Sequence, residues 1–287
     1  MKMFRSSLVA LLLAAAPAAH AAPALWKVSD ADTTIYLFGS IHALPGGTPW
    51  FAGPVKTAFE KADTLVLEMV APKSEGEFAP SLMAMGFSDG QPPLAERVAA
   101  TERPRLAAAL RDASLPAAAL NAMETWLATL MLSMQQFKSF GLDPKLGVER
   151  QLTVKAEAAK KRIVGLETAA EQMGYFDALP EADQRAFLSA TLKQWPGMKA
   201  KIGDLVGKWT AGDDAAIAAE FSASMKETPR LSKVLLADRN ARWAEWIKAR
   251  MAQPGTVFVA VGAGHLAGTD SVQAKLARHG LKSERVE

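Results

Sequence analysis

Residues 33–42 are Thr-Thr-Ile-Tyr-Leu-Phe-Gly-Ser-Ile-His, an apolar run that leads into a histidine. Its first six residues are β-branched, aromatic or aliphatic and end at Gly39, which predicts a buried strand over residues 33–38. Near the other end of the chain, an apolar run from Thr256 to Val261 is followed by Gly-Ala-Gly-His. Each predicted strand therefore leads into a Gly-x-x-His sequence, the first ending at His42 and the second at His265.

Two further short apolar runs end at a glutamate. Residues 64–67 are followed by Glu68, and residues 162–166 are followed by Glu167. Short continuous apolar runs bounded by turn residues are typical of strands that are covered on both faces. We therefore predict an α/β fold with a mixed central sheet covered by helices and a large helical insertion. A weaker final strand is predicted over residues 281–286.

The segments between these strands are helical in composition. The segment between the second and third predicted strands is rich in Ala, Leu and Met, and Asp143-Pro144 within it is typical of a helix start. A second helical block covers residues 168–253, and its last and longest helix is expected to begin at Thr228-Pro229. Because no linker rich in Gly, Ser or Pro interrupts the sequence, we predict one domain over residues 22–287.

The N-terminus has the features of a signal peptide. Lys2 and Arg5 precede an apolar run over residues 8–16, and Ala19-His20-Ala21 supplies a cleavage signal. We predict a signal peptide over residues 1–21 and a mature chain that is periplasmic or secreted. Stable membrane insertion after cleavage is not expected, because the apolar run is shorter than the roughly 20 residues that cross a bilayer. An uncleaved N-terminal anchor is the alternative.

Composition excludes several classes of function. The formal net charge is +3, and removal of Lys2 and Arg5 takes away two of those three charges, so nucleic acid is not an expected partner. The chain has no cysteine, which excludes a thiol nucleophile and a Cys-based zinc or iron–sulfur site. The sequence also lacks a P-loop, a His-Glu-x-x-His motif and a dinucleotide fingerprint, and Ser40 is not in a nucleophile elbow.

Two of the histidines are the leading candidates for chemistry. His42 and His265 each follow a strand in the same Gly-x-x-His frame, where the glycine is expected to let the chain turn sharply. Neutral imidazole is the commonest metal ligand in proteins and a ready general base near neutral pH. For either histidine alone a structural role is favoured, but the matched frames of the two favour a shared site. His279, before Gly280, is interpreted as a structural residue at a helix end.

The two strand-end glutamates are expected at the same edge of the sheet. A buried carboxylate is costly unless it is paired, solvated or bound to a metal. Glu68 and Glu167 could therefore join the two imidazoles in a divalent-metal site that is open to water. The alternative is that each glutamate caps the following helix, as Glu167-Thr168 could do.

The long helix before the last strand contributes two further candidates. Asn240 falls in line with Leu236, Trp243 and Ile247, so an amide is set into an apolar helix face and requires a partner. Arg239 could clamp an anion or a carboxylate, or orient a glutamate. An ordinary buried polar bridge is the alternative for both residues, and Trp243 is interpreted as a packing residue.

The sequence as a whole resembles the TraB/PrgY/GumN family, which includes Tiki-like proteases and belongs to a wider group with erythromycin esterase and ChaN. Nearly all of the mature chain takes part in this resemblance. The matching stretches are Leu25–Val28, Tyr36–His42, Asp63–Glu68, Gly165–Thr168 with Gln172, Arg239-Asn240 and Val261–Gly268. The family more often has threonine at the position of Ser40.

The resemblance implies an α/β fold with a helical insert and a site built from His42, Glu68 and His265. Tiki-like members imply a metal-dependent peptidase, and the expected cofactor is a divalent ion: manganese, cobalt or zinc. We therefore expect an exported hydrolase that acts on a peptide or small molecule, with Glu68 as a ligand or general base. Glu167, Arg239 and Asn240 are expected to support the site or bind substrate. The alternative is a non-catalytic protein that binds haem, iron or a peptide.

Overall fold

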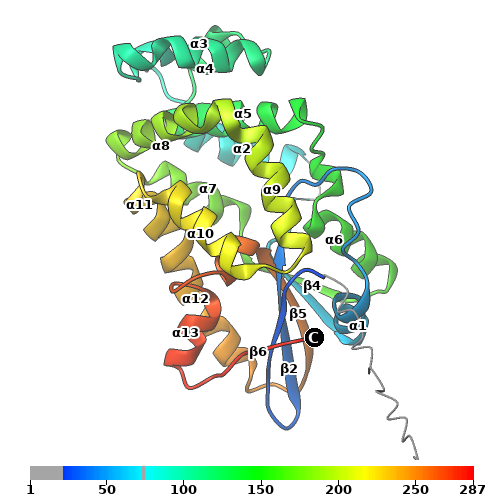
Figure 1. Ribbon diagram of the computed structural model, residues 1–287. Helices are drawn as coiled ribbons and strands as arrows, with labels where there is room; N and C mark the ends of the chain where they lie inside the picture. Colours follow the sequence, from blue (N-terminus) through cyan, green and yellow to red (C-terminus); the bar gives the residue numbers. More distant parts are fainter. Residues whose placement is uncertain (1–21, 73–74) are drawn as a thin grey trace, which may run out of the picture.

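A six-stranded mixed sheet forms the centre of the molecule (Figure 1). The structure is a computed structural model, and it describes residues 22–72 and 75–287. The strand order across the sheet is β4-β3-β5-β2-β1-β6. The strands are β1 (Leu25–Ser29), β2 (Thr33–Ser40), β3 (Thr64–Met69), β4 (Arg162–Glu167), β5 (Gly255–Gly262) and β6 (Glu284–Arg285). This architecture confirms the predicted α/β fold.

The two central strands carry the two Gly-x-x-His motifs. β2 and β5 pair in parallel, with Gly39 opposite Val261 and Ser40 opposite Gly262. β3 is the other parallel neighbour of β5, and it brings Glu68 to the same edge of the sheet. Residues more than 200 positions apart in the sequence therefore leave the sheet side by side, because parallel strands end at a common edge.

Helices cover both faces of the sheet, and the side chains of the strands divide between the two layers. Phe38, Leu67 and Phe258 pack under α1 (Gly53–Lys61) and α6 (Val148–Ala158). Alternate strand residues such as Leu37, Val66 and Val259 pack under α12 (Asp238–Arg250) and α13 (Val272–Arg278). This alternation explains why the strands are continuously apolar, since side chains pointing to either face are buried.

A helical insertion follows β3 and forms a separate layer at one end of the molecule (Figure 1). Its α-helices before α6 are α2 (Glu75–Gly86), α3 (Arg103–Asp112), α4 (Ala117–Asn121) and α5 (Thr125–Ser139). An apolar core joins α3 and α5 to α8 (Glu181–Gln194), which follows β4, and includes Leu106, Leu132 and Leu188. The insertion therefore shares with α8 an apolar core that is separate from the core of the sheet.

A second set of helices lies between β4 and β5. Its α-helices before α12 are α7 (Ala169–Asp177), α8 (Glu181–Gln194), α9 (Met198–Thr210), α10 (Asp214–Met225) and α11 (Pro229–Ser232). A π-helical turn, η5 (Lys233–Ala237), joins α11 to α12, so the predicted long helix does begin at Pro229 but is interrupted one turn later. π-helical turns occur frequently at functional sites.

The structure also corrects several sequence-based expectations. β1 was not predicted as a strand, and only Glu284 and Arg285 of the predicted final strand pair, with β1. Asp143 does cap a helical turn, by accepting from the Lys145 amide at 2.8 Å, but that turn is a short 3₁₀ segment, and α6 starts only at Val148.

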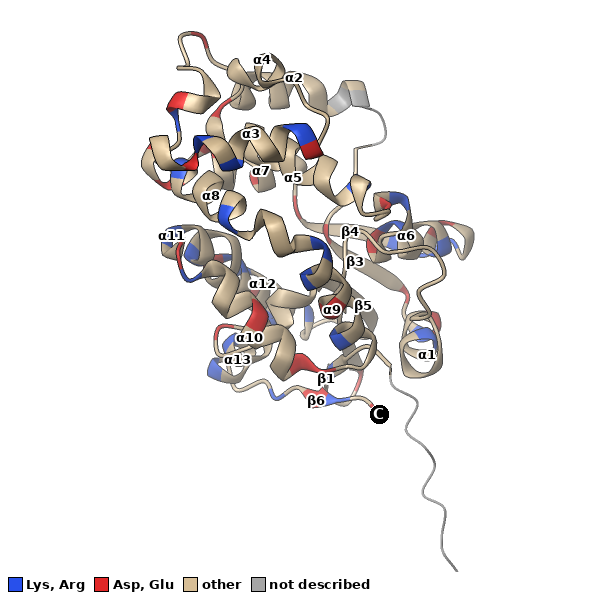
Figure 2. Cartoon of the chain, turned by 45° about the horizontal axis from the view of Figure 1, so that its top comes forward, with Lys and Arg blue, Asp and Glu red and all other residues tan. Residues whose placement is uncertain are grey.

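None of the helices in residues 22–72 and 75–287 is long and apolar enough to cross a membrane. The predicted signal peptide, residues 1–21, lies outside the described residues. Figure 2 shows basic and acidic residues interspersed over the helices.

Candidate functional site

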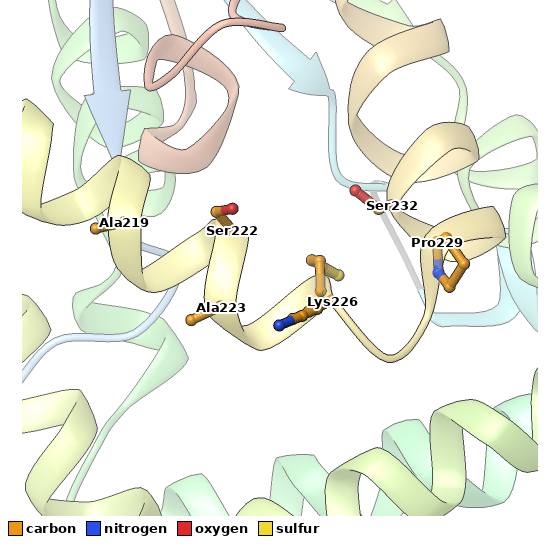
Figure 3. Close-up of a pocket in the computed structure, with 7 residues that line it drawn as sticks. Ala219, Ser222, Ala223, Lys226, Pro229 and Ser232 are labelled. Carbon is orange, nitrogen blue, oxygen red and sulfur yellow. The ribbon is translucent and has the colours of Figure 1, made fainter.

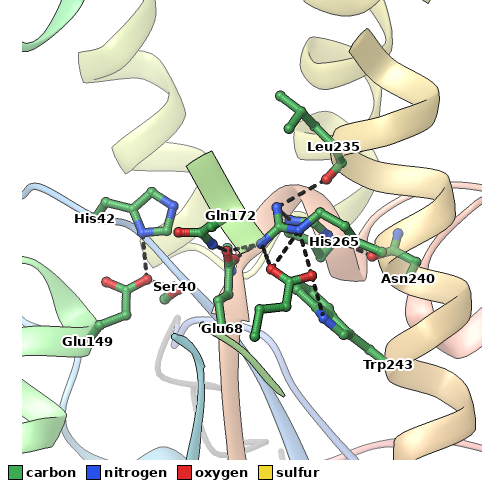
Figure 4. A network of polar contacts seen from close by, with 12 residues as sticks. Ser40, His42, Glu68, Glu149, Gln172, Leu235, Asn240, Trp243 and His265 are labelled. Carbon is green, nitrogen blue, oxygen red and sulfur yellow. Dashed lines mark hydrogen bonds and ion pairs between the residues drawn. The ribbon is translucent and has the colours of Figure 1, made fainter. Parts of the chain in front are cut away.

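The side chains of His42, Glu68 and His265 converge beside Gly262. A β-carbon at position 262 would lie 3.5 Å from Nε2 of His42, 3.2 Å from Oε1 of Glu68 and 3.6 Å from Cδ2 of His265. The sequence-based expectation that the two motifs meet beside a strand-end carboxylate therefore agrees with the structure (Figure 4).

The motif glycines allow close packing rather than an unusual turn. Gly262 has a φ of −49°, and Gly39 is not among the residues with positive φ, so the expected sharp glycine turn is wrong. Instead, a β-carbon on Gly39 would lie 3.1 Å from Cα of Ala263 in the other motif. A side chain at Gly39 would press the two motifs apart, and a side chain at Gly262 would press on the carboxylate of Glu68.

The His265 imidazole is buried and held in one tautomer. It lies in the 3₁₀ turn η6 (Ala263–Leu266), and its Nδ1 is 2.6 Å from Oδ1 of Asn240. The Asn240 amide is oriented by its Nδ2, which donates to the Asp270 carbonyl at 2.8 Å. Oδ1 must therefore accept, and Nδ1 of His265 must carry the proton. The sequence-based interpretation of Asn240 as a buried amide that needs a partner is confirmed.

The other nitrogen of His265 faces the carboxylate and the guanidinium of the site. Nε2 lies 3.2 Å from NH1 of Arg239, which can only donate, and 3.6 Å from Oε1 of Glu68. Burial lowers the pKa of His265 to about 3, although the charge of Glu68 opposes the shift. The imidazole is therefore neutral at physiological pH, with its Nε2 lone pair turned into the site.

The His42 imidazole has a different environment. Its Nδ1 lies 2.6 Å from Oε1 of Glu149 on α6, and the Ser40 hydroxyl donates to the same oxygen at 2.5 Å. The negative charge of Glu149 raises the pKa of His42 to about 9, although partial desolvation of the ring by its protein neighbours opposes this shift. Because 70% of the His42 side chain is exposed, water reaches the ring and screens part of that attraction.

Glu68 is the buried carboxylate between the two imidazoles. Its Oε2 accepts from NH2 of Arg239 at 2.6 Å and from Nε2 of Gln172 at 2.9 Å, and its Oε1 accepts from the Gly262 amide at 2.7 Å. Burial opposes ionisation, but His265, His42, Arg239 and the Gly262 N–H together outweigh it and lower the pKa of Glu68 to about 2. Glu68 is therefore ionised at neutral pH.

Arg239 joins the two strand-end glutamates. Its guanidinium donates to both carboxylate oxygens of Glu167, at 2.9 to 3.0 Å, as well as to Glu68. Its NH1 also donates to the Leu235 carbonyl in the π-helical turn at 3.1 Å. Of the two roles predicted for Arg239, the structure shows the carboxylate clamp.

Glu167 supports Arg239 and does not cap the following helix. The alternative that Glu167 caps α7 is wrong, because Thr168 does so in a capping box with Glu171. Glu167 instead also accepts from Nε1 of Trp243 at 3.1 Å and from the Tyr175 hydroxyl at 3.2 Å. Trp243 is thus more than a packing residue, and its ring also lies 4.4 Å from the ring of His265, centre to centre.

Sequence reasoning missed Glu149 and gave Gln172 no role. Glu149 is in the first turn of α6, a helix that lies between the insertion and β4, and no local pattern links it to His42. Gln172 is on α7, four residues after Thr168. Its place in the stretch that resembles the family, just after a strand-end glutamate, was the feature of the sequence that could have indicated its role. His279 is at the end of α13, where it pairs with Glu245 at 3.2 Å, in agreement with the predicted structural role.

An apolar cavity of about 300 Å³ adjoins the two histidines. Ser40, His42, Gly262 and His265 line one end of it, and side chains from α5, α9, α10 and the π-helical turn line the rest. A larger and more open depression of about 730 Å³ lies between α10 and α11 (Figure 3). Lys226 is the one charged residue among the described residues that line this depression, and no imidazole or carboxylate is among them, so acid–base chemistry is better supported in the smaller cavity.

Comparison with known proteins supports the same assignment as the motifs. A profile of the TraB/PrgY/gumN family matches residues 24–285. The chain belongs to the TraB/PrgY/gumN family. It is 25% identical over 260 residues to the uncharacterized protein YbaP of Escherichia coli, covering 88% of this chain and 92% of that protein. YbaP of Shigella flexneri is also 25% identical, over 247 residues that cover 84% of this chain and 87% of that protein. No solved structure matches the chain.

The side chains of this site include donor types that suit a metal ion. Two imidazole nitrogens and a carboxylate oxygen suit a divalent ion. The 3.6 Å between Nε2 of His265 and Oε1 of Glu68 is the spacing of two ligands that each lie about 2.1 Å from one ion. Within residues 22–72 and 75–287, however, no group of three or more acidic or histidine side chains is arranged to hold an ion as the site stands. The donor types fit, whereas NH1 of Arg239 occupies the lone pair of His265.

Proposed function

We propose that this protein is an exported metal-dependent hydrolase that acts on peptides. The observation that carries the proposal is the convergence of His42, Glu68 and His265 beside Gly262. A water-accessible imidazole, a buried neutral imidazole and a buried carboxylate at one edge of a sheet supply both ligands and acid–base groups.

The residues that surround this site orient its donors. Asn240 holds the proton of His265 on Nδ1, so Nε2 is the nitrogen available to a metal. Glu149 binds Nδ1 of His42, which leaves Nε2 on the side of the ring that faces Gly262. Partners of this kind fix the tautomer and direction of metal-binding histidines.

A bound Mn²⁺, Co²⁺ or Zn²⁺ would supply Lewis-acid chemistry, polarising a carbonyl and lowering the pKa of water. His42, His265 and Glu68 would hold the ion. Glu68 is ionised, and among the described residues its Oε1 accepts a hydrogen bond from the Gly262 amide alone, so this oxygen is open to bind the ion. Service as the general base is the alternative role of Glu68, and it would require the pKa of Glu68 to rise when Arg239 or the ion moves. Loading requires NH1 of Arg239 to release His265, while NH2 and Nε can remain bonded to Glu68 and Glu167.

Peptide binding without chemistry is the alternative, and one contact favours it. In this structure Arg239 donates to His265 Nε2, the nitrogen that a metal or a haem iron would need. A protein in which this contact persists would bind a ligand in the cavity without hydrolysing it. The 300 Å³ cavity is at the small end of ligand sites, which favours a peptide side chain over haem for this alternative.

The test is turnover of a mixed peptide library by the purified protein, followed by mass spectrometry. We expect cleavage that a chelator abolishes and that Mn²⁺, Co²⁺ or Zn²⁺ restores. His42→Ala and His265→Ala should each lower the rate by at least about 100-fold. His279→Ala is the matched control and should leave the rate unchanged, because His279 pairs with Glu245 at a helix end. Unchanged turnover in both site variants would refute the proposal.

Export is tested separately. Cell fractionation and N-terminal sequencing should place the mature protein in the periplasm or medium with Ala22 as its first residue. A cytoplasmic protein that retains residues 1–21 would contradict this part of the proposal.

A further inference from the structure

The cavity beside the two histidines has a sharply divided lining. Its polar end consists of Ser40, His42 and His265, which belong to the proposed reaction site. The remainder is apolar and comes mainly from helices outside the sheet, including Phe137 on α5, Leu205 and Trp209 on α9 and Phe221 on α10. A ligand that reaches the histidines therefore places part of its surface against an apolar wall.

We propose that this cavity is a specificity pocket that receives one large apolar side chain, aromatic or aliphatic, of the peptide substrate next to the bond that is cleaved. The inference rests on the proposed function only in taking His42 and His265 as the reacting end of the site. It adds the class of side chain that the protein selects.

The chemistry of the lining excludes a charged occupant. Among the described residues that line the cavity, none is Asp, Glu, Lys or Arg, and the His42 imidazole is already paired with Glu149, so a buried charge on the substrate would have no free counterion there. Desolvating an unpaired charge is costly, whereas burial of an apolar side chain is favourable. The lining therefore discriminates by polarity.

The volume of the cavity agrees with a side chain of this size. A dry apolar cavity of about 150 Å³ is large enough to hold benzene. At about 300 Å³, the cavity here has room for a phenyl or indole ring together with part of the neighbouring backbone. A glycine or alanine side chain would leave most of it unfilled.

The walls of the cavity are attached to both Gly-x-x-His motifs. Nε1 of Trp209 donates to the Gly39 carbonyl at 2.7 Å. The ring of Phe221 is packed so closely on Gly264 that a β-carbon there would lie 2.7 Å from it. A side chain bound between Trp209 and Phe221 thus lies in direct contact with the segments that carry His42 and His265.

The proposal is tested by binding, which does not require turnover. The probes are the capped tripeptides acetyl-Gly-X-Gly-amide, with X as Phe, Leu, Gly, Asp or Lys, titrated into the purified protein by calorimetry. We expect the Phe and Leu peptides to bind at least about 10-fold more tightly than the Gly peptide, and the Asp and Lys peptides to bind no better than Gly. Equal affinity for Phe and Gly, or a preference for a charged residue, would overturn the proposal.

Two substitutions place the selectivity in this cavity. Phe137→Asp should abolish the preference for Phe, whereas Met134→Asp, on the same helix but exposed and not in the lining, should preserve it. Leu205→Lys should raise affinity for the Asp peptide at least about 10-fold, a gain that misfolding cannot produce. Loss of the preference in Met134→Asp, or no gain in Leu205→Lys, would contradict the location.

The binding assay separates this inference from the proposed function. Selective binding of the Phe peptide by a protein that cleaves nothing would support the pocket and refute the hydrolase. Cleavage of the library without enrichment of large apolar residues at the cut sites would support the hydrolase and refute the pocket.

Discussion

The two Gly-x-x-His motifs leave adjacent strands in register, yet their histidines have opposite environments. His42 is 70% exposed and bonded to a carboxylate, whereas His265 is 7% exposed and bonded to an amide and a guanidinium. The carboxylate favours the charged imidazole of His42, and burial favours the neutral imidazole of His265. The same local sequence therefore yields two chemically different groups, because residues on other helices set the pKa of each.

The asymmetry extends to the glutamates. Glu68 and Glu167 are both buried, and both depend on Arg239 for a positive charge. Glu149 on the His42 side is paired with the imidazole and the Ser40 hydroxyl instead. The His265 side is thus a closed network of ionic contacts, and the His42 side is open to water.

The largest effect is expected from Arg239. Arg239→Ala removes the main counterion of two buried carboxylates, so the free energy of unfolding should fall by about 3–5 kcal/mol in urea denaturation. Arg242→Ala is the matched control: Arg242 is one turn away, 50% exposed and 3.8 Å from Glu167, and its loss should cost less than about 1 kcal/mol. Equal losses of the free energy of unfolding in the two variants would contradict the dependence of both glutamates on Arg239.

A smaller effect is expected from the partners of the two histidines. Asn240→Ala removes the acceptor of a buried N–H on His265 and should lower the free energy of unfolding by about 1–3 kcal/mol. Glu149→Gln should cost about 1 kcal/mol or less, because water can reach His42. A larger loss of the free energy of unfolding in Glu149→Gln than in Asn240→Ala would contradict the difference between the open His42 side and the closed His265 side.

The smallest effect, taken per unit of pH, is the dependence of stability on pH, measured in the presence of a chelator. The folded pKa of His265, about 3, is below its unfolded value near 6.5, so the unfolded chain binds a proton first as the pH falls. Stability should therefore decrease below pH 6.5 by roughly 1 kcal/mol per pH unit. His265→Gln should flatten this limb of the curve of melting temperature against pH.

The opposite sign is expected for His42. Its folded pKa, about 9, is above its unfolded value, so the stabilisation by Glu149 is complete below pH 6.5 and is lost as the pH rises through 9. Histidine NMR titration of the chelated protein should show His42 changing charge well above pH 6.5 and His265 neutral down to pH 5. Identical titration of the two imidazoles would refute the asymmetry.

Much of the sheet was predictable because its strands are buried on both faces. Continuous apolar runs predicted β2 to β5. The glutamates and glycines that follow these runs predicted the edge of the sheet at which the candidate site lies. β1 was missed because Lys27 interrupts its apolar run, and Trp26 and Lys27 are only partly buried near the edge of the sheet. The 3₁₀ turn before α6 was missed because its capping signal is the same as that of a helix.

The candidate site was less predictable than the sheet. His42, Glu68 and His265 were found because strand ends have a local pattern. Glu149 was missed because it reaches His42 from a helix 107 positions away, and nothing in its neighbourhood differs from a solvated helix start. The difference in charge between the two histidines could not be predicted from the sequence, because the pKa of each imidazole depends on contacts between distant segments.

If both motifs bind one divalent ion, anomalous diffraction from crystals grown with Co²⁺ or Mn²⁺ should locate it. We expect one peak per chain, about 2.0–2.3 Å from Nε2 of His42 and from Nε2 of His265, with Arg239 withdrawn from His265. The absence of a peak there, with Arg239 still donating to His265 at saturating metal, would contradict it.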